Sequence, residues 1–251
     1  MKMNKKTIFV TGATSGVGLK ITELLVAQGH HVYATGRNEV ALKTLQRLGA
    51  NVIQADLTSL TAIDEVCAQL PPLDVAIFSA GVGKFAIAPL LSDENISEML
   101  ELNVRVPMYL AKRLAAPMIA QEQGQLIFIG SQAGKVATPK ASVYAATKHA
   151  IVGFTNGLRM ELAPYNIKVT AIHPGPIDTP FLDKVNDESG YRESLGRFLL
   201  TPEEVAQATV KTIERPVREV NLPKIMGLTS KLYALAPATI EFLAKPLFNK
   251  K

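Results

Sequence analysis

A tyrosine and a lysine four residues apart, Tyr144 and Lys148 in the run SVYAATKH, are the side chains best suited to chemistry. Residues at this spacing lie on the same side of a helix. A phenol is a poor proton donor at neutral pH unless a nearby cation favours its ionised form. Ser131 precedes the tyrosine, and a glycine-rich turn spans 11–18. The combination indicates redox chemistry between a carbonyl or alcohol and a nicotinamide cofactor.

Each of these residues also has a purely structural interpretation. Tyr144 and Lys148 can form a helix-surface pair, and Ser131 can cap a helix. Asn103 can be a helix-interior amide that bonds to nearby backbone. Their occurrence together, in this order and beside a nucleotide-type turn, favours the catalytic interpretation.

The glycine-rich turn follows a short apolar strand and precedes an amphipathic helix. Gly12, Gly16 and Gly18 stand where side chains would obstruct a pyrophosphate at the positive end of that helix. The spacing G-x-x-x-G-x-G differs from the G-x-G-x-x-G fingerprint, so a tight turn without a ligand is the alternative. Its position at the start of a βαβ unit favours dinucleotide binding.

The residues after the second and third expected strands bear on the choice of dinucleotide. An acid after the second strand would bind a free ribose 2′-hydroxyl, whereas a cation accommodates a 2′-phosphate. Gly36 and Arg37 stand there, which favours NADPH over NADH. A solvated surface arginine is the alternative. Asp56 can bind the adenine amino group or cap the helix expected to begin near Thr61.

The secondary-structure elements that must position these residues alternate regularly along the chain. Short β-branched runs alternate with helix-length segments, which predicts a parallel sheet covered by helices on both faces. We expect a single α/β, doubly wound, Rossmann-type domain over 1–226. A helix should end at Gly29, another should run from Ser92 to about Leu102, and a third should start at Thr201. The expected strands are Thr7–Thr11, His31–Thr35, Asn51–Ala55, Val75–Ser79, Gln125–Gly130 and Lys168–His173.

Composition excludes several other classes of protein. The 251 residues are 47% hydrophobic and 20% charged, an ordinary globular balance. The single cysteine, Cys67, allows no intrachain disulfide and fits a reducing cytosol. The net charge of +5 is scattered, so nucleic acid is not indicated. Neither a secretion signal nor a membrane-spanning apolar run is recognisable. No metal site is expected, because histidine, cysteine and acids form no cluster with ligand spacing.

Several motifs occur in the order found in one family: the chain resembles a short-chain dehydrogenase/reductase from Thr11 to about Thr179. The matching motifs are Thr11–Gly18, Asp56, Ser79-Ala80-Gly81, Asn103, Ser131, Tyr144-x-x-x-Lys148 and Pro174-Gly175-Pro176-Ile177-Asp178-Thr179. One departure is Phe78-Ser79 where the family usually has two asparagines. The lost amides imply a repacked strand end with retained cofactor binding.

The resemblance implies a role for each site residue. Tyr144 would exchange a proton with the substrate oxygen, and Lys148, together with the positive nicotinamide, would lower the tyrosine pKa. Lys148 would also hold the nicotinamide ribose. Ser131 would donate a hydrogen bond to the substrate oxygen, and Asn103 would join a water relay to Lys148. The implied cofactor-binding residues are Gly12, Thr14, Ser15, Gly16, Val17, Gly18, Arg37, Asp56, Leu57, Ala80, Gly81, Tyr144, Lys148, Pro174, Gly175, Ile177 and Thr179.

The segment after the last motif should form the substrate lid, at about 178–200. Its apolar residues either line a pocket for a lipophilic carbonyl compound or pack onto the domain. These residues are Phe181, Leu182, Tyr191, Phe198, Leu199 and Leu200.

The C-terminal tail, 227–251, is apolar and rich in lysine. It can lie on an anionic membrane, cover the active site or seal a subunit contact. Packing is favoured, because two prolines interrupt any long amphipathic face. By the family resemblance, helices near Pro107–Ala120 and Ala145–Leu162 would form a homodimer or homotetramer.

The sequence therefore predicts an NADPH-dependent carbonyl reductase, or alcohol dehydrogenase in reverse, in the cytoplasm, with peripheral contact to the membrane as the alternative offered by the tail. The substrate would be a ketone or secondary alcohol. The alternatives are a non-catalytic NADP(H)-binding sensor and a peripheral membrane protein on the same fold. Neither would require an intact set of serine, tyrosine and lysine.

Overall fold

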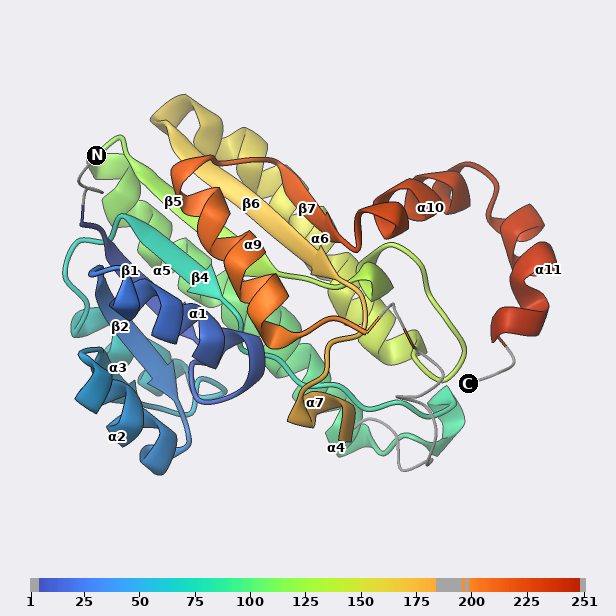
Figure 1. Cartoon of the computed structure of the whole chain (residues 1–251), viewed down its shortest axis with the longest axis horizontal. Coiled ribbons are helices and arrows are strands. Elements are labelled where there is room, and N and C mark those ends of the chain that lie inside the picture. Colours follow the sequence, from blue (N-terminus) through green and yellow to red (C-terminus); the bar gives the residue numbers. More distant parts are fainter. Residues whose placement is uncertain (1–4, 184–195, 197–198, 249–251) are drawn as a thin grey trace.

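Seven parallel strands form one sheet with helices on both faces (Figure 1), in the order β3-β2-β1-β4-β5-β6-β7. The computed structural model describes residues 5–183, 196 and 199–248. The predicted doubly wound α/β fold is confirmed. The strands are β1 Thr7–Thr11, β2 His31–Gly36, β3 Asn51–Gln54, β4 Val75–Phe78, β5 Gly124–Ile129, β6 Ile167–Pro174 and β7 Glu219–Leu222.

The helices divide between the two faces of the sheet and the ends of the strands. One face is covered by α1 Gly16–Ala27, α2 Glu39–Leu48 and α9 Pro202–Glu214. The other face is covered by α3 Leu60–Ala68, α5 Val106–Ala120 and α6 Ser142–Leu162. The other α-helices within the described residues are α4 Asp93–Leu100, α7 Pro180–Asp183, α10 Lys224–Leu235 and α11 Pro237–Phe248.

Successive side chains along each strand point to opposite faces of the sheet and so contribute to two apolar layers. In β1, Ile8 and Val10 pack in the layer under α1 and α9, whereas Phe9 packs in the layer under α3 and α5. All three side chains are fully buried. Each stabilises the fold by roughly 1.5–3 kcal/mol through removal of apolar surface from water. The strands are apolar on both faces because both faces meet helices.

The six strands expected from the sequence are confirmed to within one residue at each end. The seventh strand, β7, is not among the expected ones. It pairs with β6 at the edge of the sheet, and all four of its residues are half-buried. Its polar Glu219 and Asn221 give a short alternating pattern that resembles a loop in the sequence.

Two expected helix starts are confirmed by their caps. The Ser92 hydroxyl accepts a hydrogen bond from the Asn95 N–H at 3.2 Å. Thr201 and Glu204 form a reciprocal capping box, with Pro202 in the first turn. The helix after Ser92, expected to run to about Leu102, ends at Leu100 and passes into a π-helical turn, Glu101–Arg105, that leads directly into α5. A π turn inserts an extra residue and is frequent at functional sites.

A buried histidine makes the fold sensitive to acid. His173 of β6 is 1% exposed, and its Nε2 lies 3.8 Å from Glu219 Oε2. Burial lowers the pKa of His173 to about 4; Lys135 acts in the same direction and Glu219 opposes both. The folded protein therefore keeps this imidazole neutral where an unfolded chain would protonate it.

We expect the free energy of unfolding to decrease as the pH falls from 6.5 towards 4, because the unfolded chain then binds a proton at His173 that the folded chain excludes. The loss reaches roughly 3 kcal/mol. Urea unfolding at pH 7 and pH 4.5 measures it. His173→Gln should show a smaller difference between the two pH values, whereas substitution of the exposed His31 should retain the wild-type difference. An unchanged difference in His173→Gln would contradict this account.

Candidate active site

The site lies where the order of strands reverses, between β1 and β4 (Figure 1). Chains leaving neighbouring strands diverge at such a point and open a crevice at the carboxyl ends of the strands. A cavity of about 520 Å³ occupies this place. Gly12 after β1 and Gly81 after β4 line it, together with Tyr144 and Lys148 of α6. The glycine turn and the tyrosine–lysine motif, which lie far apart in the sequence, thus share one cavity.

The glycine turn is shaped by close backbone contacts. Gly12 has φ of 66°, and a Cβ there would lie 2.7 Å from the backbone nitrogen of Ala80. A Cβ at Gly18 would overlap the carbonyl oxygen of Gly12, so α1 begins directly against the turn. Ser15 precedes α1 in extended conformation, and its side chain makes no capping bond. The first N–H groups of α1, which lack partners within the helix, are at the cavity.

The end of β4 is braced without the two family asparagines. The Thr11 hydroxyl oxygen accepts hydrogen bonds from the backbone N–H groups of Ser79 and Ala80, both at 3.1 Å. Phe78 stacks on Phe128, with ring centroids 4.5 Å apart. The expected repacking of this strand end is therefore found. Thr11 and the aromatic pair supply the bracing.

Thr14, Arg37, Asp56 and Leu57, which are expected to bind the cofactor, are not among the residues that line this cavity. Thr14 packs against the end of β2, where a Cβ on Gly36 would lie 2.5 Å from Thr14 Cγ2. Glycine at this position thus leaves room for the threonine. Arg37 follows directly and is exposed.

Asp56 and Leu57, after β3, have separate surroundings. The Asp56 carboxylate accepts from the backbone N–H of Thr58 at 3.1 Å and from its hydroxyl at 2.9 Å. Ser59 caps α3. The interpretation of Asp56 as the helix cap is therefore wrong. Leu57 is 4% exposed and belongs to the core under α3.

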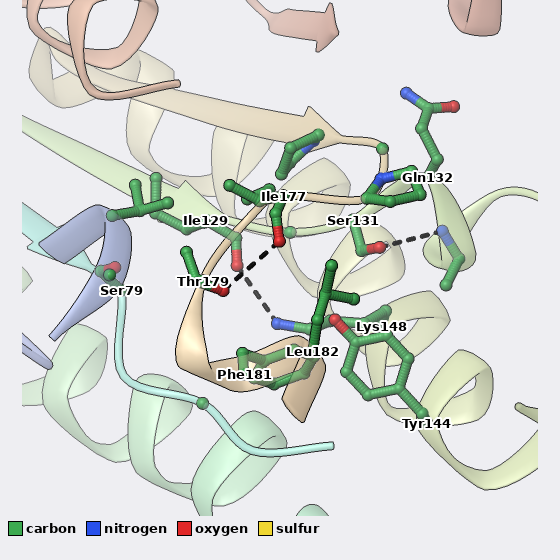
Figure 2. A pocket seen from close by; sticks show the side chains of 18 of the residues that line it. Ser79, Ile129, Ser131, Gln132, Tyr144, Lys148, Ile177, Thr179, Phe181 and Leu182 are labelled. Carbon is green, nitrogen blue, oxygen red and sulfur yellow. Dashed lines mark hydrogen bonds between the residues drawn. The ribbon is translucent and has the colours of Figure 1, made fainter. Parts of the chain in front are cut away.

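Tyr144 and Lys148 project from adjacent turns of α6 into the cavity (Figure 2). Both are buried. Lys148 Nζ lies 5.7 Å from the centroid of the tyrosine ring and donates to the Ile129 carbonyl at 3.3 Å. The lysine is thus held at the end of β5, and the helix-surface interpretation of this pair is excluded.

Burial dominates the electrostatics of the pair. It raises the pKa of Tyr144 to about 12, and the nearby Ser131 hydroxyl acts in the opposite direction. It lowers the pKa of Lys148 to about 8. The protein by itself therefore keeps the phenol protonated at neutral pH. Lowering of the tyrosine pKa by Lys148 together with the positive nicotinamide stays a prediction, because it requires the bound cofactor.

Ser131 both caps a turn and borders the cavity. Its oxygen accepts from the Ala133 N–H at 3.1 Å, at the start of the 3-10 turn Gln132–Gly134. An accepting hydroxyl still has its proton to donate. The structural and catalytic interpretations of Ser131 are therefore compatible.

Asn103 lies behind the cavity, inside the π-helical turn, and is 2% exposed. Its side chain accepts from the Val82 N–H and donates to the Val82 carbonyl, both at 2.8 Å. It also donates to the Thr147 hydroxyl at 3.1 Å, which in turn donates to the Tyr144 carbonyl at 2.7 Å. Asn103 therefore ties the loop after β4 to the helix that carries the tyrosine.

A polar network anchors the turn after Ser131 to β7. The Gln132 side chain donates to the His173 carbonyl at 2.8 Å and to Asn221 Oδ1 at 2.9 Å. Lys135 Nζ donates to Asn221 Oδ1 at 3.0 Å and to Glu219 Oε1 at 2.8 Å. The sequence contains no motif for this network, because its members come from three separate segments.

Aromatic rings on two sides hold the tyrosine. Phe85 meets its edge at 5.3 Å between centroids, and Phe181 of α7 lies at 5.8 Å. Figure 2 shows Phe181 and Leu182 beside the tyrosine and the lysine. Phe85, on the loop after β4, has no local pattern in the sequence that points to the site.

The residues expected to form the lid lie in different parts of the structure. Phe181 and Leu182 line the cavity, as expected for a pocket. Leu200 instead bridges to Ile177 and packs in the core under α9, as the packing alternative requires. Leu199 is half-buried. Tyr191 and Phe198 lie outside the described residues.

Comparisons with known proteins identify a family and similar relatives for this chain. Residues 6–190 match the short chain dehydrogenase family. The uncharacterized oxidoreductase YmfI of Bacillus subtilis (strain 168) is 31% identical over 217 residues, which cover 81% of this chain and 89% of the relative.

Two solved structures extend the likeness to the fold. The closed form of a serine dehydrogenase complexed with NADP+ is 30% identical, with a TM-score of 0.81, over 86% of this chain and 94% of that chain. A variant of actinorhodin polyketide ketoreductase with NADPH is 28% identical, with a TM-score of 0.81. The likeness covers 89% of this chain and 97% of that chain.

The family match and the geometry agree. The match spans more than half of the chain. The glycine turn, Ser131, Tyr144 and Lys148, which carried the resemblance in the sequence, line one cavity at the switch point of the sheet. The chain belongs to the short-chain dehydrogenase/reductase family of oxidoreductases.

Proposed function

We propose that this protein is an NADPH-dependent carbonyl reductase, and an alcohol dehydrogenase in the reverse direction, acting on lipophilic ketones or secondary alcohols. The observation that carries the proposal is the shared cavity of the phosphate turn and the buried tyrosine and lysine. The NADP+ and NADPH bound by the serine dehydrogenase and the ketoreductase support the choice of cofactor. A non-catalytic sensor would not need Ser131, Tyr144 and Lys148 to converge.

The residues present fit a dinucleotide. The N–H groups at the start of α1 suit the pyrophosphate, and Gly12 leaves the space that its oxygens need. Arg37 suits a 2′-phosphate, because its exposed guanidinium follows the glycine that replaces the usual acid.

The other expected contacts follow from the family pattern. Asp56 and Leu57 would border the adenine, and Ala80 and Gly81 the adenosine ribose. Lys148 would hold the nicotinamide ribose. Pro174, Gly175, Ile177 and Thr179, which line the cavity, would surround the nicotinamide.

The chain's own residues would manage the proton. When bound, NADPH supplies the hydride that reduces the carbonyl carbon. Tyr144, held protonated by burial, would give its phenolic proton to the carbonyl oxygen, and Ser131 would donate a hydrogen bond to the same oxygen. The Lys148 ammonium would stabilise the resulting phenolate, which regains its proton from solvent. Asn103 would order that route.

The walls of the cavity favour an apolar substrate. Phe85, Phe181, Leu182, Val136 and Met226 line it, together with the polar Ser131, Tyr144 and Lys148. Such a pocket gains binding energy with each buried methylene and orients the carbonyl through a few polar contacts.

Two further expectations from the family likeness complete the proposal. We place the protein in the cytoplasm. We also expect a homodimer or homotetramer formed through α5 and α6.

Tyr144→Phe should lower carbonyl reduction by roughly 10²- to 10⁴-fold, because the ring stays and only the proton donor is lost. NADPH consumption across ketones of increasing chain length measures both the loss and the preference for apolar substrates. Tyr165→Phe is the matched control, since Tyr165 is 42% exposed and lies far from α6's first turn. Equal activity in wild type and Tyr144→Phe would contradict the role of Tyr144 as proton donor. Turnover that does not improve with apolar size would contradict the substrate class.

Arg37→Ala should weaken NADPH binding about ten- to a hundred-fold, because one charge-assisted contact with the 2′-phosphate is lost. NADH, which lacks this phosphate, should bind with nearly unchanged affinity. Fluorescence titration with each nucleotide measures both values. Arg47→Ala, on the exposed side of α2, is the control and should change neither. Parallel losses for NADPH and NADH would assign Arg37 another role.

NADPH affinity should decrease as the pH rises through about 8. Burial lowers the pKa of Lys148 to about 8, so the ammonium is present below this pH and lost above it. Lys148→Arg stays charged and should show no such decrease, whereas Lys148→Met should bind weakly at every pH. Fluorescence titrations from pH 6 to pH 9.5 give the profiles. A decrease near pH 8 that persists in Lys148→Met would assign the titration to another group.

A further inference from the structure

A stripe of large aliphatic side chains on α10 is exposed to solvent. Its members are Ile225, Leu228, Leu232 and Leu235, with exposed fractions of 54%, 57%, 48% and 82%. Their spacing of three, four and three residues places them on one side of the helix. We call these four residues the α10 stripe. Single exposed leucines need no explanation, but a continuous row of them marks an interaction surface.

The opposite side of α10 shows how the helix is attached. Gly227 packs on Asn221 of β7, and a Cβ at Gly227 would lie 2.9 Å from Asn221 Cβ. Ser230 is also buried. Small residues thus hold α10 against the sheet edge, and the helix projects from the body together with α11 (Figure 1). The tail thus packs on the domain through this side of α10, whereas the α10 stripe is exposed within the chain.

The edges of the α10 stripe differ in chemistry. At 100° per residue, Lys224 and Lys231 fall along one edge, and both are exposed. Thr229 and Met226 fall along the other edge, and both line the active-site cavity. The stripe therefore lies between a row of cations and the cavity.

The charge of the segment favours an anionic partner. Residues 224–251 contain five lysines and a single acid, Glu241. That carboxylate accepts a hydrogen bond from the Tyr233 hydroxyl at 2.7 Å, which joins α11 to α10. Antiparallel pairing with a second copy would bring Lys231, near the middle of the stripe, close to its symmetry mate. An anionic surface removes this repulsion and attracts both edge lysines.

We propose that the α10 stripe docks on an anionic lipid bilayer. The four aliphatic side chains would enter the interfacial layer, and Lys224 and Lys231 would meet the lipid headgroups. The attachment is peripheral, since among residues 5–183 and 199–248 no helix is long and apolar enough to cross a membrane. Exposed Phe242 on α11 adds an aromatic side chain to the same projecting segment.

Docking would bring the mouth of the cavity close to the lipid surface, because Thr229 and Met226 adjoin the stripe. This consequence rests on the proposed function: a ketone that partitions into lipid would reach the cavity with little passage through water. The docking itself needs no turnover, so its test does not depend on activity.

Flotation of the full-length chain on a density gradient tests the proposal. We expect co-flotation with vesicles of phosphatidylcholine and phosphatidylglycerol, less with phosphatidylcholine alone, and a decrease at high salt. Leu228→Gln/Leu232→Gln should weaken binding to the vesicles at least about ten-fold, because two aliphatic side chains that would enter the lipid are lost. Lys224→Gln/Lys231→Gln should weaken it roughly 25-fold, as each lysine near an anionic surface contributes about five-fold.

Val40→Gln/Leu90→Gln is the matched control, since these aliphatic residues are even more exposed, at 76% and 74%, but lie on α2 and between β4 and α4. It should float like the wild type. Unchanged NADPH affinity in every variant shows that the fold is intact. Absence of flotation in the wild type, or equal flotation in the stripe variant, overturns the proposal. A stripe variant that instead dissociates an oligomer, as measured by light scattering, assigns the stripe to a second copy and also overturns it.

Discussion

The parallel pairing of β1 with β4 is the constraint on which the site depends. It makes the strand order reverse at this point, so the turn after β1 and the loop after β4 leave the sheet in opposite directions. The Thr11 hydroxyl holds the two strand ends together by accepting from two backbone N–H groups of the β4 end. Gly12 then allows the turn to pass directly over Ala80. The cavity exists because these strand ends are adjacent and their chains diverge.

Burial is the second controlling factor, and it acts on both ionisable groups of the site. The same loss of hydration raises the pKa of Tyr144 to about 12 and lowers that of Lys148 to about 8. Burial therefore favours a neutral phenol and makes the lysine ammonium easier to deprotonate. A phenol kept protonated is suited to give a proton to a carbonyl oxygen. Release of that proton requires positive charge beside the phenol, which the bound cofactor and the lysine would supply together.

The edge strand β7 links the site to the C-terminal helices. Its Asn221 receives hydrogen bonds from Gln132 and Lys135, which hold the turn after Ser131. The same residue packs against Gly227 of α10, and α10 supplies Met226 and Thr229 to the cavity. The position of the serine and the wall of the substrate pocket therefore share one support. That support also sets the direction in which the α10 stripe faces.

Local patterns in the sequence determined the α/β class, six strands, two helix caps and the candidate residues Tyr144, Lys148 and Ser131. Each of these depends on spacing within a short segment, such as the turn of helix between Tyr144 and Lys148. Long-range packing decided the rest. Phe85 and Met226 reach the cavity from segments that carry no motif, and β7 pairs only because β6 offers a free edge. The direction of the tyrosine pKa shift likewise depended on burial by residues distant in the chain, because desolvation is a property of the packed structure and not of neighbouring sequence.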